Sequence, residues 1–154
     1  MLDIEEFEKK IDKKSRLLGV DPGKKRVGIA ICDENKIVAT PYTTIIKNNF
    51  SDLLSQINKI ISDNDIRGVV IGNPINMDGS PSQSSQSAKD LAINLSKNIS
   101  IPITMWDERL SSRGAFNLSN DLNVNTSKKV SKLDENSAAF ILQGVLDFLN
   151  REIT

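Results

Sequence analysis

Three short apolar runs follow one another near the start of the chain. They span residues 16–21, 26–33 and 36–45, and the sequence Pro-Gly-Lys-Lys separates the first two. Apolar runs of this length that are bounded by Gly, Pro and Asn are typical of strands. The pattern predicts three sequential strands that pair as an antiparallel meander.

The apolar spacing then changes to that of a helix. Within residues 49–65, the apolar side chains of Leu53, Ile57 and Ile60 recur at helical spacing, and Ser51 is a plausible N-cap. This segment is predicted to be a helix that packs one face against the sheet.

Two further strands are predicted in the second half of the chain. Residues 67–74 form a short β-branched run, as expected of a central strand covered on both faces. A serine-rich loop at 75–86 leads into a helix near 84–97, and residues 101–110 repeat the pattern of a buried strand followed by polar residues.

The chain ends with helical patterns around a polar stretch. We expect a helix near 111–120, a mobile polar stretch at 120–132 and a last helix from about Leu133 to Asn150. The order βββαβαβα predicts an α/β fold with a mixed five-stranded sheet and helices on both faces. Residues 16–150 would form this single domain, preceded by a polar, partly helical extension at 1–15.

Composition limits the classes of function. The 154 residues suit one domain. Lys and Arg number 20 and so do Asp and Glu, so the net charge is zero and any basic surface must be local. There is no histidine, which excludes Ser-His-Asp hydrolysis, histidine acid–base catalysis and histidine-ligated metals.

Cysteine content and hydropathy bear on the compartment. The single Cys32 lies in an apolar run and excludes an internal disulfide, which fits a reducing environment. No run approaches the roughly 18 apolar residues that span a bilayer, and the N-terminus is charged. The expectation is a cytoplasmic protein that does not enter the membrane.

Acidic residues follow the predicted strands at places where a site can form. Asp21 ends the first strand, Asp107 and Glu108 end the last, and Asp134 lies in the first turn of the apolar stripe of the final helix. Ligands gather at the carboxyl ends of parallel strands, so these acids could meet there. With only oxygen ligands, the cation that offsets their repulsion would be Mg²⁺ or Mn²⁺.

Each acid also has a purely structural interpretation. Asp21 could cap the following turn, Asp134 could favour the helix N-terminus, and Asp107 or Glu108 could pair with Arg109. Their common placement favours a site. The basic residues that could contact a polyanion near it, although lysine-rich segments are commonly just solvated, are Lys24, Lys25, Arg26, Arg109, Arg113, Lys128, Lys129 and Lys132.

Four segments of the chain resemble, in order, the motifs of the YqgF/RuvX family: LGVDPGKKRVGIAICD, VVIGNPINMDGS, WDERLSS and KLDENSAAFILQGVLD. The resemblance runs from about Leu17 to Leu149 and implies a ribonuclease H-like fold. Members are described as Holliday junction resolvases or as nucleases that mature the 5′ end of the small-subunit (pre-16S) ribosomal RNA precursor.

The resemblance also implies roles for the acids. It makes Asp21 the first-strand acid, Asp107 and Glu108 the acids of the Asp-Glu-Arg motif, and Asp134 the acid of the last helix. Related resolvases have an acid at the end of the fourth strand, where this chain reads Gly-Asn-Pro at 72–74. A second metal ligand must then come from position 107 or 108. Strand alternation points these two side chains to opposite faces, so only one is expected to be a direct ligand, and Glu108 is favoured over Asp107.

Three functions stay open. The first is a metal-dependent endonuclease on ribosomal RNA precursor or branched DNA, in which Asp21, Glu108 and Asp134 bind Mg²⁺ or Mn²⁺. The second is a nucleotide-binding module of the actin and Hsp70 type, although this chain has room for only one lobe. The third is a non-catalytic RNA-binding factor. Monomer and homodimer are both compatible with the sequence, since a four-way junction calls for two symmetric sites.

Overall fold

We describe the protein from a computed structural model of residues 1–154. The structure describes residues 1–74, 78–79, 83–108 and 126–151, and the side chains of these residues apart from 83 and 126–135. The predicted helix near 111–120 lies outside the described residues.

Five strands form a single mixed sheet in the order β3-β2-β1-β4-β5. Strands β1, β2 and β3 pair antiparallel, whereas β1, β4 and β5 run parallel. The carboxyl ends of these three parallel strands therefore meet at one edge. The strands are β1 (Arg16–Pro22), β2 (Arg26–Cys32), β3 (Ala39–Ile46), β4 (Ile66–Asn73) and β5 (Ile103–Asp107).

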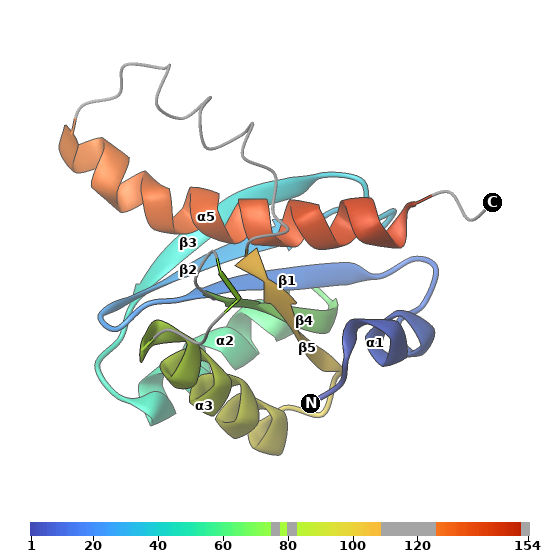
Figure 1. Cartoon of the computed structure of the whole chain (residues 1–154), viewed down its shortest axis with the longest axis horizontal. Coiled ribbons are helices and arrows are strands. Elements are labelled where there is room, and N and C mark those ends of the chain that lie inside the picture. The colour runs from blue at the N-terminus through green and yellow to red at the C-terminus, as the bar shows by residue number, and fades with distance from the viewer. Residues whose placement is uncertain (75–77, 80–82, 109–125, 152–154) are drawn as a thin grey trace.

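Helices cover both faces of the sheet (Figure 1). The long α5 crosses one face, while α2 and α3 pack against the other. This arrangement confirms the α/β class and the mixed sheet expected from the sequence. The described helices are α1 (Ile4–Lys10), α2 (Phe50–Asp63), α3 (Gln83–Asn98) and α5 (Thr126–Leu149).

Alternation along β1 divides the core between the two faces. Leu18 and Val20 are fully buried with the side chains of α2 and α3, and Leu17 is fully buried on the α5 side. Gly19 also faces α5, where an added Cβ would lie 2.8 Å from Cβ of Leu142. Because position 19 has no side chain, α5 approaches the sheet closely just before the end of β1.

The third strand begins later than the sequence predicted. It was expected from residue 36, but β3 begins at Ala39. The Asp33 carboxylate accepts hydrogen bonds from the backbone N–H groups of Ile37 and Val38, and Lys36 adopts a positive φ of 57°. The preceding residues are therefore a turn that the Asp33 carboxylate organises.

Two helix starts also differ from expectation. Asn49, rather than Ser51, caps α2, since its side chain accepts from the backbone N–H of Asp52 at 2.8 Å. Asparagine is as good an N-cap as serine, so the local pattern did not discriminate between them. The last helix begins at Thr126 rather than at Leu133, so part of the stretch at 120–132 that was expected to be mobile is helical.

The first fifteen residues contact the core. Phe7 of α1 is fully buried beside Leu17 and Val70, although most of its helix is polar. Leu2 forms a parallel bridge with Thr104 and donates its N–H to the carbonyl oxygen of Ile103 at 2.9 Å. The expected polar extension is thus anchored beside β5 in the structure.

None of the helices in the described residues is long and apolar enough to cross a membrane.

Candidate active site

Two of the predicted acids meet at the carboxyl edge of the sheet. Asp21 lies near the end of β1, and Glu108 immediately follows β5. Strand β4 lies between them, and the two side chains are joined by a hydrogen bond. The structure thus brings together two carboxylates that are far apart in the sequence.

Gly72 of β4 makes room for this pair. A Cβ at this position would lie 3.1 Å from Oε1 of Glu108 and 2.5 Å from Cδ1 of Ile141. The Glu108 carboxylate therefore occupies the space above β4 that a side chain at position 72 would need.

The electrostatics of the pair favour a bound proton or a cation. Burial, together with the charge and hydrogen bond of Asp21 and the charge of Asp107, raises the pKa of Glu108 to about 7. In its protonated form, Glu108 donates the hydrogen bond to Asp21 and relieves the repulsion between the two carboxyl groups. A divalent cation would offset the same repulsion, so this donor set fits a hard metal ion.

Asp107 belongs to the opposite face of the sheet. Trp106 packs in the α5 cluster, so alternation directs Asp107 toward the α3 side. It pairs in register with Asn73, whose side-chain Oδ1 accepts a hydrogen bond from the hydroxyl of Ser85 at 2.9 Å. Asp107 lies close enough to Glu108 to affect its pKa, but on a different side of the strand.

Asp134 lies in α5, one helical turn before Ala138. The carbonyl oxygen of Ala138 would be 2.9 Å from a Cβ at Gly19, so this part of α5 packs directly on β1. The Asp134 side chain is not among those described. In the described part of the chain, no group of three or more metal-ligating side chains is present, so the third acid of the predicted cluster stays a prediction.

The predicted basic residues fall into two groups. Lys24 and Lys25 are exposed on the turn between β1 and β2, and the exposed Arg26 begins β2. A Cβ on Gly23 would lie 2.1 Å from the carbonyl oxygen of Arg26, so this tight turn requires glycine. The second group cannot be placed against the site: Arg109 and Arg113 lie outside the described residues, and Lys128, Lys129 and Lys132 lie in α5 with undescribed side chains.

Sequence reasoning missed two features of this edge. It did not identify Lys47, whose backbone N–H donates to the carbonyl oxygen of Lys25 and which therefore lies beside the basic turn. It also considered Gly72 only as part of a segment that lacks an acidic residue at the end of the fourth strand. A glycine at the end of a buried strand is a signal for close approach by another group, and that signal was available.

The overall fold is similar to those of two solved resolvase structures. RuvC of T. thermophilus in complex with a Holliday junction superposes with a TM-score of 0.57 at 9% identity, covering 88% of this chain and 96% of that one. The yeast mitochondrial resolvase Ydc2 gives 0.54 at 13% identity, covering 95% and 84%. The protein therefore has a ribonuclease H-like fold.

Sequence comparison assigns the chain to a family within this class. The model of the RuvX family, described as Holliday junction resolvase, matches residues 15–148, and the chain belongs to that family. A Pelagibacter ubique protein named "Putative pre-16S rRNA nuclease" is 53% identical over 150 residues, covering 97% of this chain and 99% of the relative. A Novosphingobium aromaticivorans protein with the same name is 39% identical over 133 residues, covering 86% and 85%.

Proposed function

We propose that this protein is a metal-dependent endonuclease that hydrolyses phosphodiesters during 5′-end processing of the pre-16S ribosomal RNA precursor. The observation that supports the chemistry most directly is the contact between Asp21 and Glu108 at the edge of a nuclease fold. The name given to the similar proteins supports the choice of substrate.

In this proposal, Asp21, Glu108 and Asp134 hold Mg²⁺ or Mn²⁺. When bound, such an ion stabilises the negative charge that develops on the phosphate oxygens during hydrolysis. Glu108 must first lose the proton that it shares with Asp21, because only the ionised carboxylate is a ligand. Asp107 then acts from the other side of β5, where its charge influences Glu108.

The remaining residues of the site bind the substrate. Lys24, Lys25 and Arg26 extend from the turn that follows Asp21 and provide local positive charge on a chain with no net charge. Phosphate contacts of this kind position a strand without selecting its sequence. Arg109, Arg113, Lys128 and Lys129 are proposed to extend the same surface. The free thiol of Cys32 is consistent with a cytoplasmic site of action.

The main alternative is cleavage of branched DNA, which the description of the family favours. A four-way junction requires two symmetric cuts and hence a dimer, whereas RNA end processing can be done by a monomer. One preparation should therefore be tested on a four-way DNA junction and on precursor RNA, with its molar mass measured by light scattering. If a dimer cleaves the junction and the precursor RNA stays uncut, the proposed role in ribosomal RNA processing is wrong and the protein is a junction resolvase.

The catalytic role of the carboxylates is tested by Asp21→Asn. The amide has nearly the same shape but no charge, so we expect Mg²⁺-dependent cleavage of the precursor RNA to fall at least ~100-fold while the fold is retained. Gel-resolved cleavage rates and circular dichroism give the two readouts. The matched control is Asp63→Asn, on an exposed residue at the end of α2.

Asp63→Asn is expected to keep the wild-type cleavage rate. Undiminished cleavage by folded Asp21→Asn protein would refute the assignment of the site. If no preparation cleaves RNA or DNA, yet a strain that depends on the protein is rescued by Asp21→Asn, the protein is instead a non-catalytic binding factor.

A further inference from the structure

A small pocket lies at the carboxyl edge of the sheet on its α3 side, whereas Asp21 and Glu108 lie on the α5 side of the same edge. It has a volume of about 180 Å³, and its wall includes Lys24 and Lys47 together with Ser84 and Ser87. Pro22, which directly follows Asp21, forms part of the same wall. The pocket and Asp21 therefore lie at the same end of β1, on opposite faces of the sheet.

The fold holds the two lysines on adjoining segments. Lys24 belongs to the turn between β1 and β2, and Lys47 follows β3. The backbone N–H of Lys47 donates a hydrogen bond to the carbonyl oxygen of Lys25 at 2.8 Å, which fastens the two segments together. The backbone thus places Lys24 and Lys47 along the wall of one pocket.

The opposite wall is fixed to the same edge of the sheet. Ser85, which is only 1% exposed, donates to Oδ1 of Asn73 at the end of β4. This bond anchors the first turn of α3 and leaves the neighbouring Ser84 and Ser87 exposed at the pocket. The hydroxyl groups of Ser84 and Ser87 add hydrogen-bond donors to the positive charge of the lysines.

The lining has positive charge and no acid to balance it. Among the described residues, no carboxylate lies within ion-pair distance of Lys24 or Lys47, and none lines the pocket. The volume is several times the ~30 Å³ that a water molecule occupies in the liquid, which leaves room for a phosphate group and its hydration. Two ammonium groups and two hydroxyls suit a phosphate oxyanion.

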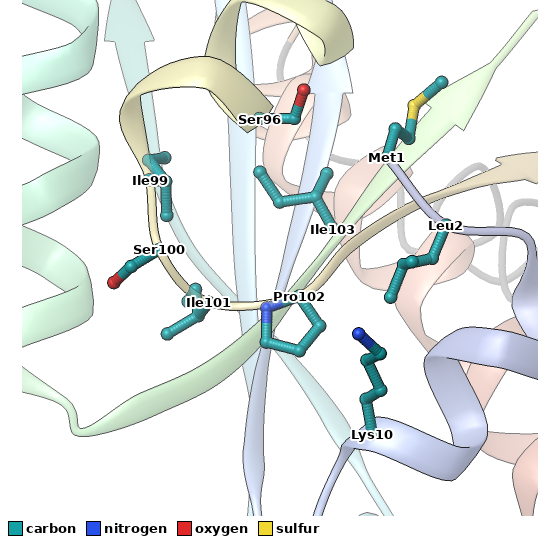
Figure 2. A pocket seen from close by; sticks show the side chains of 9 residues that line it. All are labelled: Met1, Leu2, Lys10, Ser96, Ile99, Ser100, Ile101, Pro102 and Ile103. Atoms are coloured by element: carbon teal, nitrogen blue, oxygen red, sulfur yellow. The ribbon is translucent and has the colours of Figure 1, made fainter.

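A larger cavity elsewhere in the molecule lacks this chemistry. This pocket has a volume of about 400 Å³ and lies at the amino end of β5. Ile101, Pro102 and Ile103 form an apolar wall, and Lys10 is the one charged side chain among the described residues that line it (Figure 2). It lies at the opposite end of β5 from Glu108. Charge and position together therefore favour the smaller pocket as a substrate subsite.

We propose that the pocket of Lys24, Lys47, Ser84 and Ser87 binds a backbone phosphate of the nucleic-acid strand, next to the phosphate that is cleaved. This inference rests on the proposed nuclease function for its substrate. It adds Lys47 and the start of α3 to the binding surface, so that the strand is held on the α3 side of Asp21. A phosphate held there would orient the neighbouring linkage for hydrolysis.

The test is the salt dependence of RNA binding by Lys47→Gln. A fluorescein-labelled precursor RNA is titrated with protein at several KCl concentrations, and anisotropy gives the dissociation constant. The Asp21→Asn background without divalent salt prevents cleavage. Loss of one phosphate contact should reduce the slope of log affinity against log salt by about 0.7 for single-stranded RNA. The matched control, Lys97→Gln, changes an exposed lysine at the far end of α3 and should keep the original slope.

A second probe locates the contact. One phosphate at a time is replaced by an uncharged methylphosphonate, and replacement beside the cleaved linkage should weaken binding to the parent protein but not to Lys47→Gln. Equal slopes for Lys47→Gln and Lys97→Gln would overturn the pocket proposal, even if wild-type protein cleaves RNA. A reduced slope for Lys47→Gln, without cleavage by the wild-type protein, would support phosphate binding in the pocket but contradict the proposed nuclease function. Circular dichroism of each variant confirms that it is folded.

Discussion

At the scale of single residues, the site depends on the absence of a side chain. Gly72 leaves space above β4, and Glu108 reaches from the end of β5 into that space to contact Asp21. The burial of the site and the charge of Asp21 disfavour ionisation of Glu108. The protein thus keeps two acids together that would be more stable apart, a conflict typical of functional sites.

This conflict predicts a pH-dependent stability that Glu108→Gln removes. The pKa of Glu108 is about 7 in the folded protein against an ordinary value of 4.5. Between these values the folded state binds more protons than the unfolded chain, so the free energy of unfolding falls as the pH rises. Allowing for partial exposure, we expect a loss of about 1 to 2 kcal/mol.

Urea unfolding in EDTA measures this loss when the free energy of unfolding at a pH below 4.5 is compared with that at a pH above 7. Glu108→Gln should lack it and be the more stable protein at the higher pH, whereas Glu5→Gln, on an exposed residue of α1, should follow the wild type. The same pH dependence in Glu108→Gln and wild type would show that the two carboxyl groups do not interact as described.

Some of these residues could be predicted from the sequence and others could not. Asp21 and Glu108 follow apolar runs, and alternation is enough to separate Glu108 from Asp107. Lys47 had no such signal, because its place beside Lys25 depends on how β2 and β3 pair. Residues that join a site through strand pairing are visible only once the register is known.

At the scale of elements, close packing of helices on the sheet brings the parts of the site together. Gly19 lets α5 approach β1 near Ala138. Asp134 lies one helical turn before Ala138, on the side of the edge where β1 ends. On the other face, the Ser85–Asn73 bond fixes the start of α3 at the same edge. Both helices are therefore positioned by contacts that lie next to the carboxylates.

The short α1 gives the clearest prediction at this scale. Phe7 is fully buried beside Leu17, and an added Cβ at Gly68 would lie 2.8 Å from its ring. Phe7→Ala should lower the free energy of unfolding by about 3 to 5 kcal/mol, because it leaves a cavity in the core. Lys9→Ala, on the exposed side of the same helix, should change it by less than about 0.5 kcal/mol.

Chemical unfolding followed by tryptophan fluorescence gives both values. If Phe7→Ala unfolds at the same urea concentration as Lys9→Ala, then α1 does not pack on the sheet. The sequence of residues 1–15 did not predict this role, since one aromatic residue among charged neighbours gives little periodic signal. The strands were predicted better, because apolar runs between turn residues mark them directly.

At the scale of the whole molecule, the proposed chemistry is concentrated at one edge of the sheet. The chain has no net charge, so long-range attraction to nucleic acid is weak and contacts near the site must hold the substrate. This edge is formed by the carboxyl ends of β1, β4 and β5, where Asp21 and Glu108 lie in contact. The order of elements predicted this edge, since parallel strands bring their carboxyl ends together.

The most direct test of the account is Mn²⁺ binding, measured by the loss of the free-ion signal in electron paramagnetic resonance. We expect wild-type protein and Asp63→Asn to bind Mn²⁺ with equal affinity, and Asp21→Asn, Glu108→Gln and Asp134→Asn each to weaken binding at least ~10-fold. Wild-type affinity in Asp134→Asn or Asp21→Asn would contradict a cation shared by these acids.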